Sequence, residues 1–149
     1  MTLTKDQQKA GYPLPAYNFR VTVDGAAMSF AEVSGIHVER ESVTYRHGFS
    51  FWEGEGIKTY RYDKFVPVTL KKGTVKGFSE LYDWINEQQT RPRMVEVSLC
   101  DEEGRPLVTW RIRKAVPVKL EAPTFDAKTN EVSVESLELM VRGITIEHH

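Results

Sequence analysis

The chain has 149 residues, of which 40% are hydrophobic and 28% are charged, a composition that excludes a disordered chain and is typical of a globular domain. Twenty basic residues balance twenty-one acidic ones, for a formal net charge of -1, so no overall field favours nucleic acid or an anionic membrane as a partner. A chain of this length predicts one domain around a single core.

The ends of the chain and its cysteine content indicate where it folds. Cys100 is the one cysteine, which excludes an internal disulfide. Residues 1–10 are polar, without the apolar run of a secretory signal, and no stretch approaches the ~20 apolar residues of a membrane helix. We therefore expect synthesis and assembly in the cytoplasm. We interpret residues 1–16, with Gly11, Pro13 and Pro15, as an extended arm and residues 17–149 as a single domain.

The first half of the domain predicts short antiparallel strands. Residues 19–23 alternate apolar and polar side chains and end at the turn pair Asp24-Gly25, which indicates a half-buried strand and a hairpin. Proline has no N–H to donate to a neighbouring strand, so the strand that contains Pro67 is expected at a sheet edge or with a bulge. Four further strands are expected in this half, at residues 28–34, 36–46, 57–62 and 65–70.

A change from period two to the helical period predicts one helix over Val75 to Gln89, with Thr74 as its N-cap. The apolar residues expected on one face of this helix are Phe78, Leu81, Tyr82 and Ile85.

Alternation resumes after the helix and predicts a second hairpin. Residues 95–100 and 108–113 flank the polar turn 101–104, and the alternation of Trp110 with its neighbours places the indole in the core. Another strand is expected over residues 116–120, around Pro117.

A loop over residues 121–130 then leads to a last long strand. Val132 and Val134 are out of phase with the apolar residues that begin at Leu137. This phase change predicts a bulge near Glu135-Ser136. The predicted fold class is mainly β with one flanking helix.

No residue cluster indicates catalysis, a metal or a cofactor. The four histidines are scattered, and neither an H-E-x-x-H nor a paired C-x-x-C motif occurs. Cys100 alternates with strand residues, which favours packing over a nucleophile and leaves a hydrolase as the last alternative. Arg111 and Arg113 beside Trp110 are a combination found in grooves that bind single-stranded nucleic acid. The predicted core position of the Trp110 indole argues against such a groove. We expect no enzyme, no cofactor and no specific nucleic-acid recognition.

Several segments together resemble the tail-tube family of contractile phages and related phage-tail-like particles of bacteria. The resemblance runs from about Tyr17 to Gly143. Its two most specific segments are Ala31-Glu32-Val33-Ser34-Gly35 and the stretch from Asn130 to Leu139. Supporting segments are Asn18 to Val21 with Asp24-Gly25, Tyr45 to Gly48, Thr69 to Gly73, Trp84, Asp101 to Gly104, Trp110 and Lys114 to Pro117.

The resemblance implies a β-barrel or sandwich with a flanking helix, and hexameric rings stacked into a hollow tube that a contracting sheath drives through a target envelope. Implied partners are the chain itself, a sheath protein, baseplate and cap proteins, and cargo in the lumen. The alternatives are a baseplate or tube-terminating adaptor of the same particle, or a secreted type VI-like ring protein. Exposed strand edges agree with ring formation, because identical neighbours can close them.

The segment from His47 to Gly56 carries three large aromatics within four residues, between glycines that allow unusual backbone conformations. One interpretation is a hydrophobic loop folded back on its own barrel. The interpretation we favour is an extended loop that packs on the next subunit. The predicted subunit-interface residues are Phe49, Phe51 and Trp52.

Overall fold

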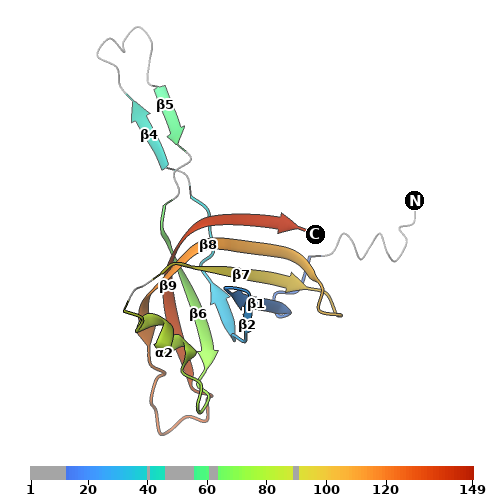
Figure 1. The fold of residues 1–149 in the computed structure, drawn as a ribbon, viewed down its shortest axis with the longest axis vertical. Helices are drawn as coiled ribbons and strands as arrows, with labels where there is room; N and C mark the ends of the chain where they lie inside the picture. The colour runs from blue at the N-terminus through green and yellow to red at the C-terminus, as the bar shows by residue number, and fades with distance from the viewer. Residues whose placement is uncertain (1–12, 40, 46–55, 61–63, 89–90) are drawn as a thin grey trace, which may run out of the picture.

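The fold is mainly β with one short helix, as predicted (Figure 1). A computed structural model describes residues 13–39, 41–45, 56–60, 64–88 and 91–149 of the chain. In order, the described elements are β1 (Phe19–Val23), β2 (Ala26–Met28), β3 (Glu32–Ser34), β4 (Glu41–Tyr45), β5 (Gly56–Tyr60), β6 (Val66–Gly73), α2 (Glu80–Ile85), β7 (Arg93–Cys100), β8 (Pro106–Glu121) and β9 (Val134–His148).

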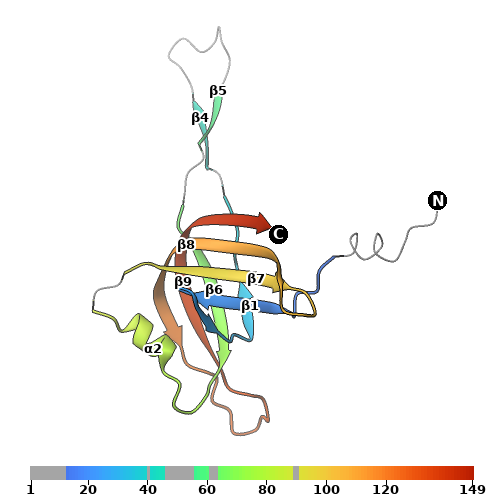
Figure 2. The ribbon, with the colours of Figure 1, turned by 45° about the vertical axis from the view of Figure 1, so that its right-hand side comes forward.

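Seven strands form one antiparallel sheet in the order β2-β1-β7-β8-β9-β6-β3. The long strands β8 and β9 curve, so that the two halves of the sheet run in different directions (Figure 2). Residues 29–31 join the two edge strands, β2 and β3, yet these strands do not pair within the described residues. The sheet is therefore a barrel that stays open between its first and last strands.

Period-two alternation builds the core, because alternate side chains of each strand point to the same face. Leu137, Leu139 and Val141 on β9 are each 0% exposed. Leu81 and Trp84 on α2 close one side of this core against the sheet, where α2 packs on β8. Further members come from the other strands: Val21, Val23, Val66, Val68, Leu70, Val95, Val97, Ile112 and Ala115.

The remaining two strands form a separate hairpin. β4 pairs with β5 from Glu41↔Tyr60 to Tyr45↔Gly56, and Figure 1 shows this hairpin standing away from the seven-stranded sheet. The expected strand at residues 36–46 is thus limited, among described residues, to β4. The expected strand at 28–34 is split between the end of β2 and β3.

The predicted helix over residues 75–89 is wrong in length, since α2 spans Glu80–Ile85. Gly77 has a φ of +78°, a left-handed conformation that interrupts a right-handed helix just before it begins. Ser79, and not Thr74, occupies the N-cap position. Tyr82 is 58% exposed, because a helix this short buries only the pair at spacing three, Leu81 and Trp84.

Phe78 lies outside the helix and has a different role. The Lys72 ammonium is 3.3 Å from the centroid of the Phe78 ring and 5.8 Å from that of Phe30. Lys72 is only 7% exposed and continues the inward face of β6. The aromatic faces therefore stabilise a buried cation where the core meets the turn before α2.

The expected core position of Trp110 is also wrong, since the indole is only half-buried. Trp110 pairs in register with Val97 and Ile146, on a part of the inward face that β3 does not cover. Thr109, on the other face, is 3% exposed instead. Its hydroxyl is within hydrogen-bond distance of Ser98 Oγ at 2.8 Å.

The expected bulge near Glu135-Ser136 is wrong as well. β9 pairs with β6 without interruption from Gly73↔Val134 to Val66↔Val141. The register shift lies instead in β8, between Pro117 and Lys119, where proline lacks the N–H that a regular ladder needs. The strands expected at 108–113 and 116–120 are consequently one long strand, β8.

Both predicted turns are confirmed. Asp24 and Gly25 have φ values of 49° and 81°, as a two-residue turn of type I′ requires, and join β1 to β2. The turn after β7 is held by Asp101, whose Oδ1 accepts hydrogen bonds from the backbone N–H groups of Glu103 and Arg105 at 2.9 and 2.8 Å.

Candidate assembly surfaces

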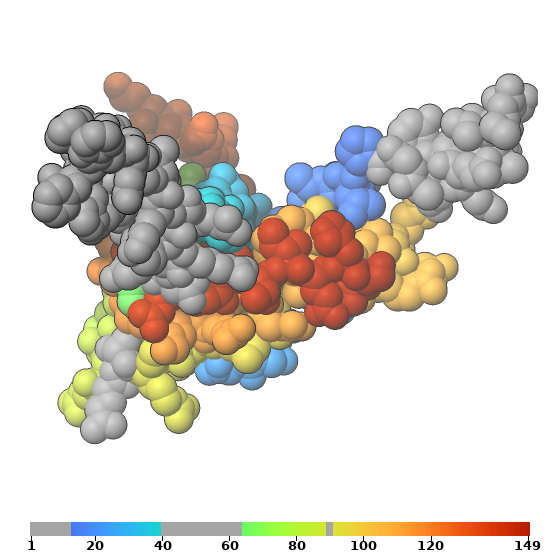
Figure 3. All heavy atoms as spheres, turned by 90° about the horizontal axis from the view of Figure 1, so that it is seen from above, coloured from blue at the N-terminus to red at the C-terminus, as the bar shows by residue number. Residues whose placement is uncertain are grey.

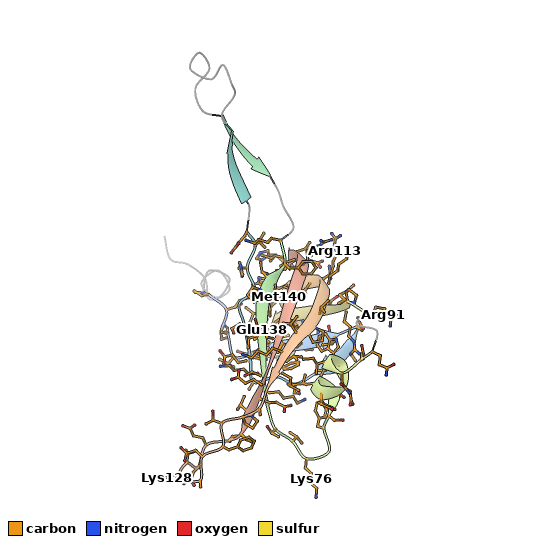
Figure 4. All side chains as sticks on the ribbon, turned by 90° about the vertical axis from the view of Figure 1, so that its left-hand side faces the viewer. Lys76, Arg91, Arg113, Lys128, Glu138 and Met140 are labelled. Carbon is orange, nitrogen blue, oxygen red and sulfur yellow. The ribbon has the colours of Figure 1, made fainter. Side chains whose placement is uncertain are left out.

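The predicted interface residues Phe49, Phe51 and Trp52 lie outside the described residues. The strands that position their segment are described, since Tyr45↔Gly56 is the last pair of the β4–β5 hairpin. The loop of residues 122–133, which connects β8 to β9, lies at the end of the molecule opposite the β4–β5 hairpin, where Figure 4 labels Lys128. The molecule thus presents different surfaces at its two ends.

The C-terminal half of β9 has a free edge. β6 pairs with β9 only as far as Val141, whereas β8 pairs with it as far as His148. Among the described residues no strand occupies the other side of Arg142–His148, and Ile146 there is 51% exposed. Seen from above, these C-terminal residues lie uncovered at the surface (Figure 3). Such an edge presents unpaired backbone groups to any further strand.

Polar contacts hold this free end in place. Arg111 on β8 donates hydrogen bonds to Glu96 on β7 at 3.1 Å and to Glu147 on β9 at 3.2 Å. The hydrogen bond and charge of Glu96, followed by those of Glu147, raise the pKa of the Arg111 guanidinium above its ordinary value. His149 adds a backbone hydrogen bond to the Leu107 carbonyl at 2.9 Å. These contacts link the end of β9 to β7 and β8.

An apolar groove of about 670 Å³ lies where the barrel is open. One wall comes from β3 and the residues after it, and the other from the start of β1 with β7 and β8. We name it the β3–β8 groove, and its large apolar residues are Tyr17, Phe19, Val33, Ile36, Val97, Leu99 and Trp110. Its only charged lining residue among those described is Glu32.

A second concave surface, of about 610 Å³, lies on the sheet face formed by β3, β6, β9 and the end of β8. It is polar and charged, and Lys71 Nζ is 3.5 Å from Glu32 Oε2 within it. Figure 4 shows Glu138, one of its lining residues, on β9. This surface contrasts with the β3–β8 groove, which is mostly apolar.

The candidate residues for chemistry are not brought together in the described part of the chain. Cys100 is 7% exposed and its thiol faces the Ser98 carbonyl at 3.7 Å. His37 contacts the Gly35 carbonyl and Glu39. No group of three or more histidine, cysteine, aspartate or glutamate residues among those described is placed to hold a metal ion. None of the described helices is long and apolar enough to cross a membrane.

Comparison with known proteins identifies relatives of the whole chain. The sequence model of the family described as T4-like virus tail tube protein gp19 matches residues 15–145. A chain in the cryo-EM structure of an extracellular contractile injection system, the PVC sheath-tube complex in its extended state, is 29% identical with a TM-score of 0.88. That match covers 99% of this chain and 100% of the other.

Two other solved structures extend the comparison. A chain from the anti-feeding prophage cap, the AFP tube terminating cap, is 31% identical with a TM-score of 0.83, and 93% of each chain is covered. Hcp1 from Flavobacterium johnsoniae is 15% identical with a TM-score of 0.55, over 89% of this chain and 97% of that one, which shows a similar fold. No curated protein matches the sequence.

Proposed function

The chain belongs to the T4-like virus tail tube protein family and is a tail tube protein of a contractile injection system, and we propose that six copies form a ring whose stacking builds a hollow inner tube. Sheath contraction would drive this tube through a target envelope. The observation that carries the proposal is the match over the full chain to a protein of a sheath-tube complex. A baseplate or terminating adaptor, or a secreted ring protein, is less favoured.

Ring formation gives the free edge of the sheet a partner. The outer side of Arg142–His148 is unpaired among the described residues, and an exposed strand edge of this kind tends to associate with other strands. A cyclic head-to-tail interface uses the same two surfaces at every contact, so a closed ring leaves no copy with an open surface. We assign the edge of β9 to this contact between ring neighbours.

The proposed sheath, baseplate and cap partners follow from solved structures similar to this chain, which include a sheath-tube complex, a tube terminating cap and a baseplate. We propose a sheath protein around the tube, baseplate and cap proteins at its ends, and cargo in the lumen. In this proposal the chain is a structural protein without catalysis, made and assembled in the cytoplasm as part of a phage-tail-like particle.

We also assign Phe49, Phe51 and Trp52 to the contact between subunits. Their support is the sequence, which places three aromatics within four residues, together with the β4–β5 stem that stands away from the sheet (Figure 1). An apolar patch of this kind on a monomer marks an interaction site.

Electron microscopy of the purified chain tests the proposed function, beside sedimentation velocity over a range of concentrations. Six-membered rings or tubes of unlimited length are expected. Single rings that never stack would favour the adaptor, and a strictly monomeric mass at high concentration would contradict both assignments.

A further inference from the structure

We infer that the β3–β8 groove of one copy is the docking site for the aromatic segment Gly48–Trp52 of a second copy. The inference rests on the proposed function and adds to it the surface that receives this segment. The β3–β8 groove lies at the open edge of the barrel. Its proposed occupant is an uncharged stretch rich in aromatic side chains.

The groove is built as an apolar receptor. Trp110 and Ile36, from opposite walls, are both only partly buried. Tyr17 at the rim is 84% exposed. Apolar pockets of roughly 300–1,000 Å³ enclose drug-sized ligands, so a groove of about 670 Å³ has room for more than one aromatic side chain.

The groove and the segment match in charge. Glu32 is the only charged residue among the described ones that line the groove, and Gly48-Phe49-Ser50-Phe51-Trp52 carries no charge. No other part of the chain outside the described ranges contains three aromatics within four residues. An uncharged segment rich in aromatic side chains thus matches an apolar groove with a single charged residue among its described lining.

The position of the hairpin favours a second copy as the source of the segment. Each stem strand has five residues, a length of about 17 Å at ~3.4 Å per residue, and both views show the stem directed away from the sheet that contains the groove (Figures 1 and 2). A protrusion and a receptor on different parts of one surface make a heterologous contact, which repeats from copy to copy in a ring or a stack.

Cysteine cross-linking tests the inference in assembled tubes. Cys100→Ser provides a parent chain without native cysteines. One derivative carries Ser34→Cys in the groove, and another, with a tag of different mass, carries Ser50→Cys between the aromatics. Co-assembly followed by oxidation is expected to give a disulfide-linked pair of the two chains on a non-reducing gel.

Two matched derivatives control for chance proximity. Ser136→Cys places the same change on the polar concave surface, and its chain is expected to form no link with the Ser50→Cys chain. Thr124→Cys lies beside Phe125, which is 85% exposed and is another apolar candidate to fill the groove. A link from Ser34→Cys to Thr124→Cys in place of Ser50→Cys would overturn the inference.

A further derivative tests whether the aromatic side chains themselves, and not only the proximity of the two cysteines, produce the cross-link. Adding Phe51→Ser and Trp52→Ser to the Ser50→Cys chain is expected to lower the yield of the linked pair by roughly tenfold or more, because the transfer of both side chains out of water is lost. An undiminished yield would contradict the inference.

The readouts distinguish the inference from the function on which it rests. Tubes of the parent chain seen by electron microscopy, without a link between Ser34→Cys and Ser50→Cys, would overturn the groove assignment and leave the proposed function standing. A parent chain that forms neither rings nor tubes would overturn both.

Discussion

Leu139 shows how single residues hold the barrel together. It is 0% exposed and lies in the middle strand of three, between Val68 on β6 and Pro117 on β8. Leu139→Ala is expected to lower the free energy of unfolding by about 2–5 kcal/mol, because the removed atoms lose their transfer free energy and leave a cavity. Urea denaturation of dissociated chains measures this change.

Leu14 is the matched control for this substitution. It is 40% exposed, so Leu14→Ala removes the same atoms from a site that water already reaches. A change well under that of Leu139→Ala is expected. Equal effects of the two substitutions would contradict the burial of Leu139.

Asp101 gives a prediction about pH. The backbone hydrogen bond from Arg105 is the main cause that lowers the pKa of this carboxyl below its ordinary 3.8, and the Arg105 side chain and the Glu103 N–H add to it. A lowered folded pKa means that the charged form stabilises the fold above about pH 3.8, and that this stabilisation is lost as the pH falls through the folded pKa.

Asp101→Ala is therefore expected to unfold more easily than the parent near pH 7, with a difference that shrinks in acid. Thermal unfolding followed by circular dichroism between pH 2 and pH 7 measures it. Asp126→Ala is the aspartate control, because this carboxylate accepts a backbone hydrogen bond from Lys128 in the exposed loop between β8 and β9. A difference that grows on acidification would contradict the assignment.

At the scale of elements, glycine decides how closely β3 approaches β6. Gly35 has a φ of +92°, and a Cβ there would lie 2.9 Å from the Pro67 carbonyl oxygen. Gly25 has a φ of +81° with open space around it. Gly25→Ala is expected to destabilise the protein by about 1–2 kcal/mol through backbone strain alone, and Gly35→Ala by more, because it adds a backbone clash. Denaturant unfolding of both variants measures the difference, and an equal loss would contradict the close approach.

Strands could be predicted where the alternation of apolar and polar residues is regular, as for β1, β6 and β7. The length of α2 could not, because Phe78, Leu81, Tyr82 and Ile85 have helical spacing whether or not Gly77 adopts its left-handed conformation. The bulge was placed at a phase change in β9, whereas Pro117, which lacks an N–H, was the better signal.

The surfaces were harder to predict than the elements. Alternation places Trp110 on the inward face, and it does lie on that face, opposite Val97. Whether such a residue is buried depends on what covers it, and Trp110 lines an open groove together with β3. Strand order, which determines the free edge of β9, depends on pairing between distant segments and is not encoded in local periodicity.

At the scale of the whole molecule, distinct surfaces at the two ends suit a subunit that repeats along an axis. The β4–β5 hairpin projects from one end and the Ala122–Ser133 loop from the other (Figures 1 and 4). The core lies in the sheet between them. Substitutions in the segment that joins β4 to β5 should therefore affect assembly and leave the barrel folded.

Changing Phe51 and Trp52 together to serine tests this separation. Burying one such aromatic against a neighbour contributes on the order of 1.5–3 kcal/mol, and a ring repeats the loss at every copy of the interface. The double variant is expected to keep the β signal in circular dichroism while electron microscopy shows no tubes. Tyr82→Ser, at a 58% exposed site on α2, is the control and should leave tubes intact. Intact tubes in the double variant would contradict the interface assignment, and loss of the folded signal would instead place the two aromatics in the core of the monomer.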